Sequence, residues 1–165
     1  MNSIIYIMGV SGSGKTTVGR LLGARTGIPF FDGDDFHSIA NKEKMQAGIP
    51  LTDEDRQGWL QQLHALAEKE STNKGAIIAC SALKEKYRQL LSAHVQKPVW
   101  VFLSGSFDLI AQRLTNRAGH FMPPALLQSQ FKALEIPQDV FTVEVDQEPE
   151  AIADKIWELL KKQPL

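Results

Sequence analysis

The eight residues GVSGSGKT, at positions 9–16, constrain this chain more than any other stretch of its sequence. They fill every fixed position of the pattern G-x-x-x-x-G-K-[S/T], whose glycines let successive backbone N–H groups point at a phosphate chain. A β-branched apolar run at residues 4–8 precedes the stretch, and apolar residues at helical spacing follow it up to Gly27. The pattern therefore predicts a strand, a phosphate-binding loop and a helix.

The predicted ligand of this loop is a nucleoside triphosphate with Mg²⁺. Lys15 supplies a positive charge for the β- and γ-phosphates, and the Thr16 hydroxyl is the expected magnesium ligand. The helix that follows adds its unpaired N–H groups and the positive end of its dipole. We expect these consecutive residues to bind the nucleotide: Gly9, Val10, Ser11, Gly12, Ser13, Gly14, Lys15, Thr16 and Thr17.

Short apolar runs alternate with helical patterns along the rest of the chain. Strands are predicted at residues 4–8, 28–32, 75–80, 99–103 and 141–145, and helices at 37–46, 84–93, 107–116 and 152–160. A further helix starts after Thr52, where a hydroxyl followed three residues later by a carboxylate resembles a capping box. We predict a single α/β domain over residues 1–165, with a five-stranded parallel sheet covered by helices on both faces.

Residues 117–137 interrupt this alternation. They contain Gly119, Pro123 and Pro124 and a short polar helix pattern, but no strand. An insertion of this kind between the fourth and fifth strands predicts a mobile lid; an ordinary surface excursion is the alternative.

Charge and composition argue against several kinds of partner. The formal net charge is −1, so no overall basic field recruits nucleic acid or an anionic membrane. No apolar run approaches the ~18 residues of a membrane span, and the first apolar run is already used as a strand, so we expect no signal peptide. The single cysteine, Cys80, cannot form an internal disulfide, and we expect a cytoplasmic protein.

Three classes of phosphate-loop protein remain: a small-molecule kinase, a GTPase-type switch and a nucleotide-binding regulator without transfer activity. The guanine-specifying Asn-Lys-x-Asp motif of switch families is missing, because Asn73-Lys74 is followed by Gly75-Ala76. The third strand ends at Cys80-Ser81 without the Walker-B aspartate that many motor-type ATPases carry. Asp32 and Asp34, after the second strand, are therefore the carboxylates expected nearest to the loop, at the carboxyl edge of the sheet.

Longer motifs resemble those of gluconate kinases, which are relatives of shikimate kinase in the nucleoside-monophosphate-kinase-like group. The matching segments are Asp32-Gly33-Asp34 with Asp35-Phe36-His37, the residues 41–60, the run Cys80-Ser81-Ala82-Leu83-Lys84 with Tyr87-Arg88, and residues 113–121. The resemblance implies the reaction ATP + D-gluconate → ADP + 6-phosphogluconate. A kinase for another small hydroxy acid or sugar acid, such as shikimate, is the alternative.

The resemblance also implies roles for single residues. Asp34 would act on the acceptor hydroxyl, while Asp32 would orient a magnesium-bound water. Arg113 would lie near adenine, and Arg117 would act catalytically by reaching the phosphates as the lid closes. His120 in the lid would touch either ligand, and a homodimer is expected.

The remaining candidates lie where the predicted elements meet the ligand edge. A carboxylate acceptor needs positive donors, for which Arg56, Lys84 and Arg88 are candidates, with solvated surface charges as the alternative. His37 is a candidate donor or acceptor for a sugar hydroxyl. Gln147, after the last strand, borders the expected adenine site.

Overall fold

The computed structural model describes residues 2–117 and 123–163. Five strands form one sheet in the order β2-β3-β1-β4-β5, and all neighbouring strands are parallel. The strands are β1 (Ile4–Met8), β2 (Phe30–Asp32), β3 (Ala76–Ala79), β4 (Pro98–Ser104) and β5 (Phe141–Glu144). The predicted parallel sheet is confirmed, although β2 begins two residues later than the apolar run suggested.

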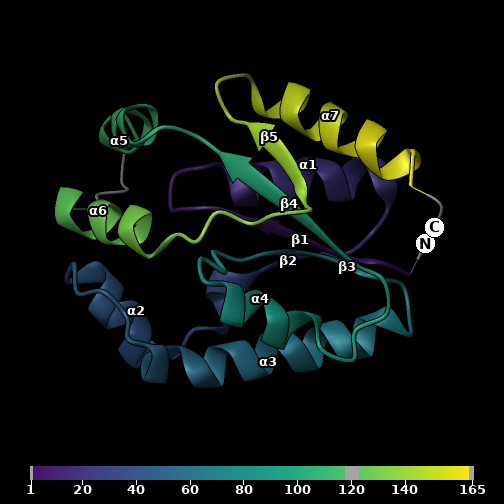
Figure 1. Cartoon of the computed structure of the whole chain (residues 1–165), viewed down its shortest axis with the longest axis horizontal. Helices are drawn as coiled ribbons and strands as arrows, with labels where there is room; N and C mark the ends of the chain where they lie inside the picture. Colours follow the sequence, from purple (N-terminus) through teal and green to yellow (C-terminus); the bar gives the residue numbers. More distant parts are fainter. Residues whose placement is uncertain (1, 118–122, 164–165) are drawn as a thin grey trace.

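Helices cover both faces of the sheet, so the molecule has three layers (Figure 1). On one face lie α1 (Lys15–Thr26) and α7 (Pro149–Lys161), and on the other α3 (Asp53–Ser71) and α4 (Glu85–Ser92). The shorter elements are the 3₁₀ helix η1 (Gly33–Phe36), α2 (Ile39–Gln46), α5 (Phe107–Thr115) and α6 (Pro124–Ala133). Helices α2, α5 and α6 stand near the carboxyl ends of the strands, where ligands bind in parallel sheets.

Strand β1 lies in the centre of the sheet and divides the core into two halves. Successive side chains of a strand point to opposite faces. Ile5 and Ile7 pack with α1 and α7, whereas Ile4, Tyr6 and Met8 pack with α3. Because both faces are covered, β1 is apolar at every position, which is why its sequence shows no alternation.

Local signals set the ends of the helices. Gly27 ends α1 with a left-handed φ of 73°, and its N–H bonds the Gly23 carbonyl. The predicted capping box is present at the start of α3, where Thr52 Oγ1 accepts from Asp55 N–H and Asp55 Oδ2 accepts from Thr52 N–H.

Part of the predicted lid belongs to the core. Helix α6 buries Leu126 and Leu127, and Leu127 is 2% exposed in the same cluster as Ile110 of α5. The apolar face of α6 thus packs on the core of the domain, and the mobility expected of this segment stays a prediction. Residues 118–122 lie outside the described residues, and a closing motion of the segment stays a prediction.

None of the helices in the described ranges is both long enough and apolar enough to cross a membrane.

Candidate active site

The phosphate loop connects β1 to α1 in the conformation that its glycines allow. Gly12 and Gly14 have φ values of 81° and 95°, which other residues rarely adopt. Gly9 permits a close approach, because a Cβ there would lie 2.7 Å from Ser13 Oγ. Ser13 Oγ is buried and has no hydrogen-bond partner among the described residues. A buried, unpaired hydroxyl in a glycine-rich loop at a helix N-terminus fits a bound phosphate chain.

Lys15 and Asp34 line one pocket, although one begins α1 and the other lies in η1. The Lys15 ammonium group donates to the Val10 carbonyl at 3.0 Å. Desolvation lowers the pKa of Lys15, while the Asp34 carboxylate opposes this shift. Asp34 is open to the pocket, yet the surrounding protein desolvates it and raises its pKa, which Lys15 opposes. The predicted meeting of the loop with the aspartates after β2 is confirmed.

Thr16 and Asp32, the two predicted magnesium ligands, are adjacent. Thr16 Oγ1 donates to Asp32 Oδ2 at 3.0 Å, and Asp32 Oδ1 accepts the Asp34 N–H at 3.0 Å. Mg²⁺ is usually held by one or two such oxygen ligands together with phosphates and water. The residues present therefore fit a magnesium ion beside the loop.

The pocket that contains Lys15 and Asp34 has a volume of about 260 Å³ and draws on distant parts of the chain. We call it the acceptor pocket. Its lining comprises Ser11, Lys15, Asp34, His37, Met45, Pro50, Leu51, Thr52, Asp53, Arg56, Ser81, Leu83, Lys84, Leu126, Ser129, Gln130 and Ala133. Four of the predicted substrate-binding residues, Asp34, His37, Arg56 and Lys84, lie in it.

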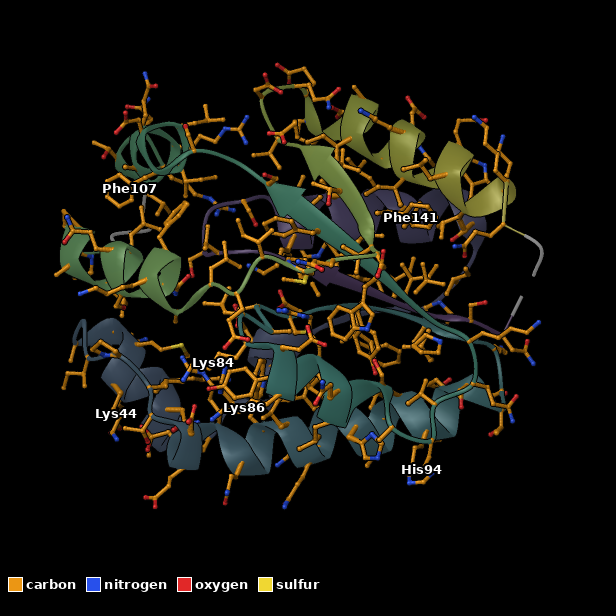
Figure 2. All side chains as sticks on the ribbon, in the orientation of Figure 1. Lys44, Lys84, Lys86, His94, Phe107 and Phe141 are labelled. Atoms are coloured by element: carbon orange, nitrogen blue, oxygen red, sulfur yellow. The ribbon has the colours of Figure 1, made fainter. Side chains whose placement is uncertain are left out.

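Two basic side chains of the acceptor pocket, Arg56 and Lys84, are held by neighbouring residues. Arg56 donates to the Leu51 carbonyl at 2.7 Å, and its guanidinium lies 5.6 Å from the centre of the Tyr87 ring. Lys84 Nζ lies 3.2 Å from Asp53 Oδ1, and Lys86 bonds the other oxygen of Asp53. Figure 2 shows both lysines at the start of α4. Hydrogen bonds from Lys86, Tyr87 and Lys84 hold the pKa of Asp53 well below its usual range.

His37 is fixed at the wall of the acceptor pocket. Its ring stacks on Trp59 with centroids 4.4 Å apart, and its Nδ1 lies 3.3 Å from Asn41 Nδ2. Burial, with the charges of Arg56 and Lys42, lowers the pKa of His37 to about 4. The imidazole is therefore neutral near pH 7. Trp59 Nε1 also donates to the Gly33 carbonyl at 2.7 Å, which ties the ring pair to the segment that carries Asp34.

Arg88 does not line the acceptor pocket, so the structure does not support its prediction as a substrate ligand. Its side chain is 4% exposed and donates to the Ala82 and Glu135 carbonyls and to Glu85 Oε2. These bonds anchor the chain after α6 to the start of α4. The guanidinium of Arg88 is thus used within the fold.

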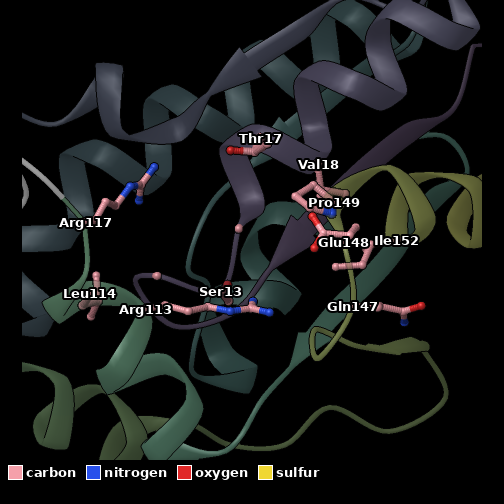
Figure 3. A pocket seen from close by; sticks show the side chains of 12 residues that line it. Ser13, Thr17, Val18, Arg113, Leu114, Arg117, Gln147, Glu148, Pro149 and Ile152 are labelled. Carbon is pink, nitrogen blue, oxygen red and sulfur yellow. The ribbon is translucent and has the colours of Figure 1, made fainter.

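A second pocket, of about 360 Å³, lies on the other side of the phosphate loop (Figure 3). We call it the nucleotide pocket. Its lining comprises Gly12, Ser13, Gly14, Thr17, Val18, Arg113, Leu114, Arg117, Gln147, Glu148, Pro149 and Ile152. Three of the predicted nucleotide-binding residues outside the loop, Arg113, Arg117 and Gln147, line this pocket. Arg113 is held by a hydrogen bond to the Val145 carbonyl. His120 lies outside the described residues.

Gln130 of α6 was missed by sequence reasoning. Its Oε1 accepts the Ser11 N–H at 2.7 Å, and its Nε2 donates to Ser11 Oγ at 3.0 Å. These two bonds join the phosphate loop to α6 at the wall of the acceptor pocket. Nothing local marked this glutamine, because it lies in a helix among other polar residues.

Cys80 is a packed strand-end residue, as predicted. It is buried and unpaired, and burial raises the pKa of its thiol to about 12. Such a thiol stays protonated and does not act as a nucleophile.

The phosphate loop after a central parallel strand, with a lysine and an aspartate facing a separate acceptor pocket, defines a P-loop kinase. The family model described as "Shikimate kinase" matches residues 11–161. The thermosensitive gluconokinase of Escherichia coli is 48% identical over 80% of this chain and 71% of its own length. The thermoresistant gluconokinase of the same organism is 42% identical, with 96% and 94% covered. The crystal structure of a gluconokinase from Sinorhizobium meliloti is 38% identical, with a TM-score of 0.85 and 99% and 98% of the two chains covered.

This chain belongs to the gluconokinase family, within the shikimate-kinase-like P-loop kinases. The family resemblance of the sequence motifs is confirmed.

Proposed function

We propose that this protein transfers the γ-phosphoryl group of ATP to D-gluconate, giving ADP and 6-phospho-D-gluconate. The observation that carries the proposal is that Lys15 and Asp34 line one acceptor pocket, while other residues of the same phosphate loop line the nucleotide pocket. The gluconokinase relatives support gluconate over shikimate as the acceptor.

In the proposed reaction, the gluconate 6-hydroxyl oxygen forms a bond to the γ-phosphorus as the bond to the β-phosphate oxygen breaks. Asp34 accepts the hydroxyl proton, and its raised pKa makes it a stronger base than an ordinary aspartate. Lys15 stabilises the charge that spreads over the transferred phosphoryl oxygens.

Thr16 and Asp32 would hold the magnesium ion, Thr16 directly and Asp32 through a bound water. The ion supplies charge neutralisation for the β- and γ-phosphates. In the same proposal the phosphate chain is bound by Gly9 to Thr17, and adenine by Arg113 and Gln147. Arg117 reaches the phosphates when the segment at 117–137 closes, and His120 contacts a ligand at that stage.

Arg56 and Lys84 recognise the acceptor carboxylate. Both line the acceptor pocket, and the fork of Arg56 suits a carboxylate. Asp53 keeps Lys84 in place before the acceptor binds. We further propose a cytoplasmic homodimer, on the strength of the family resemblance, which sedimentation analysis of the purified protein tests.

A coupled ADP-release assay tests the proposed function. Gluconate should support turnover far above that with shikimate, other aldonic acids, a nucleoside monophosphate or no acceptor. Equal rates across these acceptors would contradict the assignment. Tight ATP binding without acceptor-dependent ADP release would instead indicate a nucleotide-binding regulator.

A further inference from the structure

Asn41 is a polar residue in the first turn of α2, yet it is only 5% exposed. Buried amide groups are normally paired, because an unsatisfied donor or acceptor in the protein interior is unfavourable. Its Nδ2 lies 2.7 Å from the Asp55 carbonyl oxygen and 3.3 Å from His37 Nδ1. The side chain thus connects the start of α3 to a histidine at the wall of the acceptor pocket.

The Asp55 carbonyl determines which way the Asn41 amide points. A carbonyl oxygen only accepts hydrogen bonds, so the amide atom beside it must be the NH₂ group. An NH₂ group has two hydrogens and no acceptor capacity. One hydrogen goes to Asp55 O, and the other is directed to His37 Nδ1.

It follows that His37 Nδ1 carries no proton. A protonated Nδ1 would place an N–H donor against the amide donor, in either the other neutral tautomer or the imidazolium. The surroundings also oppose the imidazolium: Lys42 comes from α2, Arg56 from α3, and the uncharged Trp59 ring covers one face. Two carboxylates share the acceptor pocket with His37: Asp34, from η1, and Asp53, at the start of α3.

We propose that Asn41 is a positioning residue that locks His37 in the Nε2–H tautomer, so that His37 offers a hydrogen-bond donor to an oxygen of the acceptor. With Nδ1 occupied by Asn41, Nε2 is the ring nitrogen available to a ligand in the acceptor pocket. The group recognised is an oxygen with a free lone pair, either a hydroxyl or a carboxylate oxygen of a polyhydroxy acid. This inference rests on the proposed function and adds the direction of one hydrogen bond to it.

The direct test is nitrogen NMR of the full chain labelled with ¹⁵N-histidine, without ligands, near pH 7. The His37 resonances should show an unprotonated Nδ1 and a protonated Nε2. A protonated Nδ1, in a neutral ring or an imidazolium, would overturn the proposal. This readout does not depend on enzymatic activity.

Kinetics of two variants provide the second test. Asn41→Leu should raise the KM for gluconate about tenfold, because His37 no longer offers a fixed Nε2–H donor and its hydrogen bond to the bound acceptor is lost. The kcat and the KM for ATP should stay within about twofold, because that bond forms in the ground state. Ser38→Ala is the matched control, because it removes the cap of the same helix, where Ser38 Oγ accepts from Asn41 N–H, and leaves the Asn41 side chain intact. An equal change of KM in both variants would overturn the proposal.

His37→Gln distinguishes the tautomer from general packing. The glutamine NH₂ can replace the Nε2–H donor without a tautomer to fix, so Asn41→Leu should have little further effect on KM in this background. An undiminished effect of Asn41→Leu would assign Asn41 a packing role only. If the unmodified protein releases no ADP with gluconate, the proposed function fails, while the NMR experiment still decides the His37 tautomer.

Discussion

The nucleotide pocket and the acceptor pocket lie on two sides of one phosphate loop, but they are built differently. The nucleotide pocket uses three short stretches: the loop with the start of α1, the end of α5 with Arg117, and the turn into α7. The acceptor pocket collects residues from the loop, η1, α2, the turn into α3, α3 itself, the turn into α4 and α6. A single continuous motif therefore specifies much of the first pocket, whereas the second exists only after the chain has folded.

The two pockets also differ in the chemistry of their side chains. The desolvated groups Lys15, Asp34 and His37 all lie in the acceptor pocket, and each has a shifted pKa. The part of the phosphate loop that faces the nucleotide pocket is glycine, serine and threonine. In the proposed mechanism Lys15 and Asp34 act from the acceptor pocket and Arg117 from the nucleotide pocket. Changes at Asp34 should therefore affect catalysis more than nucleotide binding.

The largest expected effect is that of Asp34→Asn. Loss of the proton acceptor should lower kcat by ~10²–10⁴-fold while ATP affinity changes little. The measurement is kcat together with an ATP dissociation constant from calorimetry. Asp35→Asn, at the next and exposed position of η1, is the control and should stay near the activity of the unmodified protein. A loss confined to ATP binding would move Asp34 to the metal site.

Lys15→Ala should have the next largest effect, and it should affect both the acceptor pocket and the nucleotide pocket. Removal of a charge aimed at the transferred phosphoryl group should lower kcat by ~10²–10³-fold, the size found for one preorganised donor. Single-turnover rates at saturating ATP separate this effect from weaker binding. Exposed Lys74→Ala is the control for a simple change of net charge. Near-normal turnover would remove Lys15 from the proposed mechanism.

The acceptor side should also make the stability of the protein depend on pH through His37. The pKa of His37 is lowered from its ordinary 6.5 to about 4, so between these values the unfolded chain binds a proton that the folded protein excludes. Stability should therefore fall as pH drops through this window, by ~2–3 kcal/mol between about pH 7.5 and 4.5.

Denaturant titrations of the His37→Gln variant measure this contribution, because glutamine does not titrate. Between about pH 7.5 and 4.5, the stability of this variant should fall by ~2–3 kcal/mol less than that of the unmodified protein. Exposed His94→Gln is the control and should not reduce the fall comparably. An unchanged fall in His37→Gln would show that the burial of His37 does not control its protonation.

The smallest expected effect is that of Gln130→Ala, which cuts the link between α6 and the loop. Two hydrogen bonds to Ser11, worth ~0.5–1.5 kcal/mol each, are lost, so kcat/KM should fall about tenfold. Gln128→Ala, on the exposed side of the same helix, is the control. Equal effects of the two changes would show that Gln130 acts through the stability of α6 alone.

Most of the fold could be predicted from the sequence. Both faces of the central strands are buried, so the strands appear as unbroken apolar runs, and Gly27 and the Thr52–Asp55 box mark two helix ends in local chemistry. The segment at 117–137 was harder, because its apolar residues could belong to a lid or to the core. The burial of Leu126 and Leu127 is a long-range contact that no local pattern encodes.

The candidate site was predicted in part. Charged residues in matching motifs correctly indicated Asp34, Arg56 and Lys84, which all line the acceptor pocket. Arg88 lies in an equally specific motif, but its guanidinium donates hydrogen bonds to the Ala82 and Glu135 carbonyls. Gln130 had no motif, yet it holds Ser11. Spacing gives the position of a side chain along an element but not the direction in which its polar atoms point.

The sequence by itself determined the phosphate loop, the order of strands and helices, and the chemical identity of the groups at the carboxyl edge of the sheet. Those features depend on residues that are neighbours in the chain. Only the tertiary structure decided that Gln130 of α6 holds Ser11, that Arg88 supports the fold, and that Asn41 faces both Asp55 and His37. The physical reason is that hydrogen bonds and desolvation depend on distances of a few ångströms between residues far apart in sequence, and folding alone sets those distances.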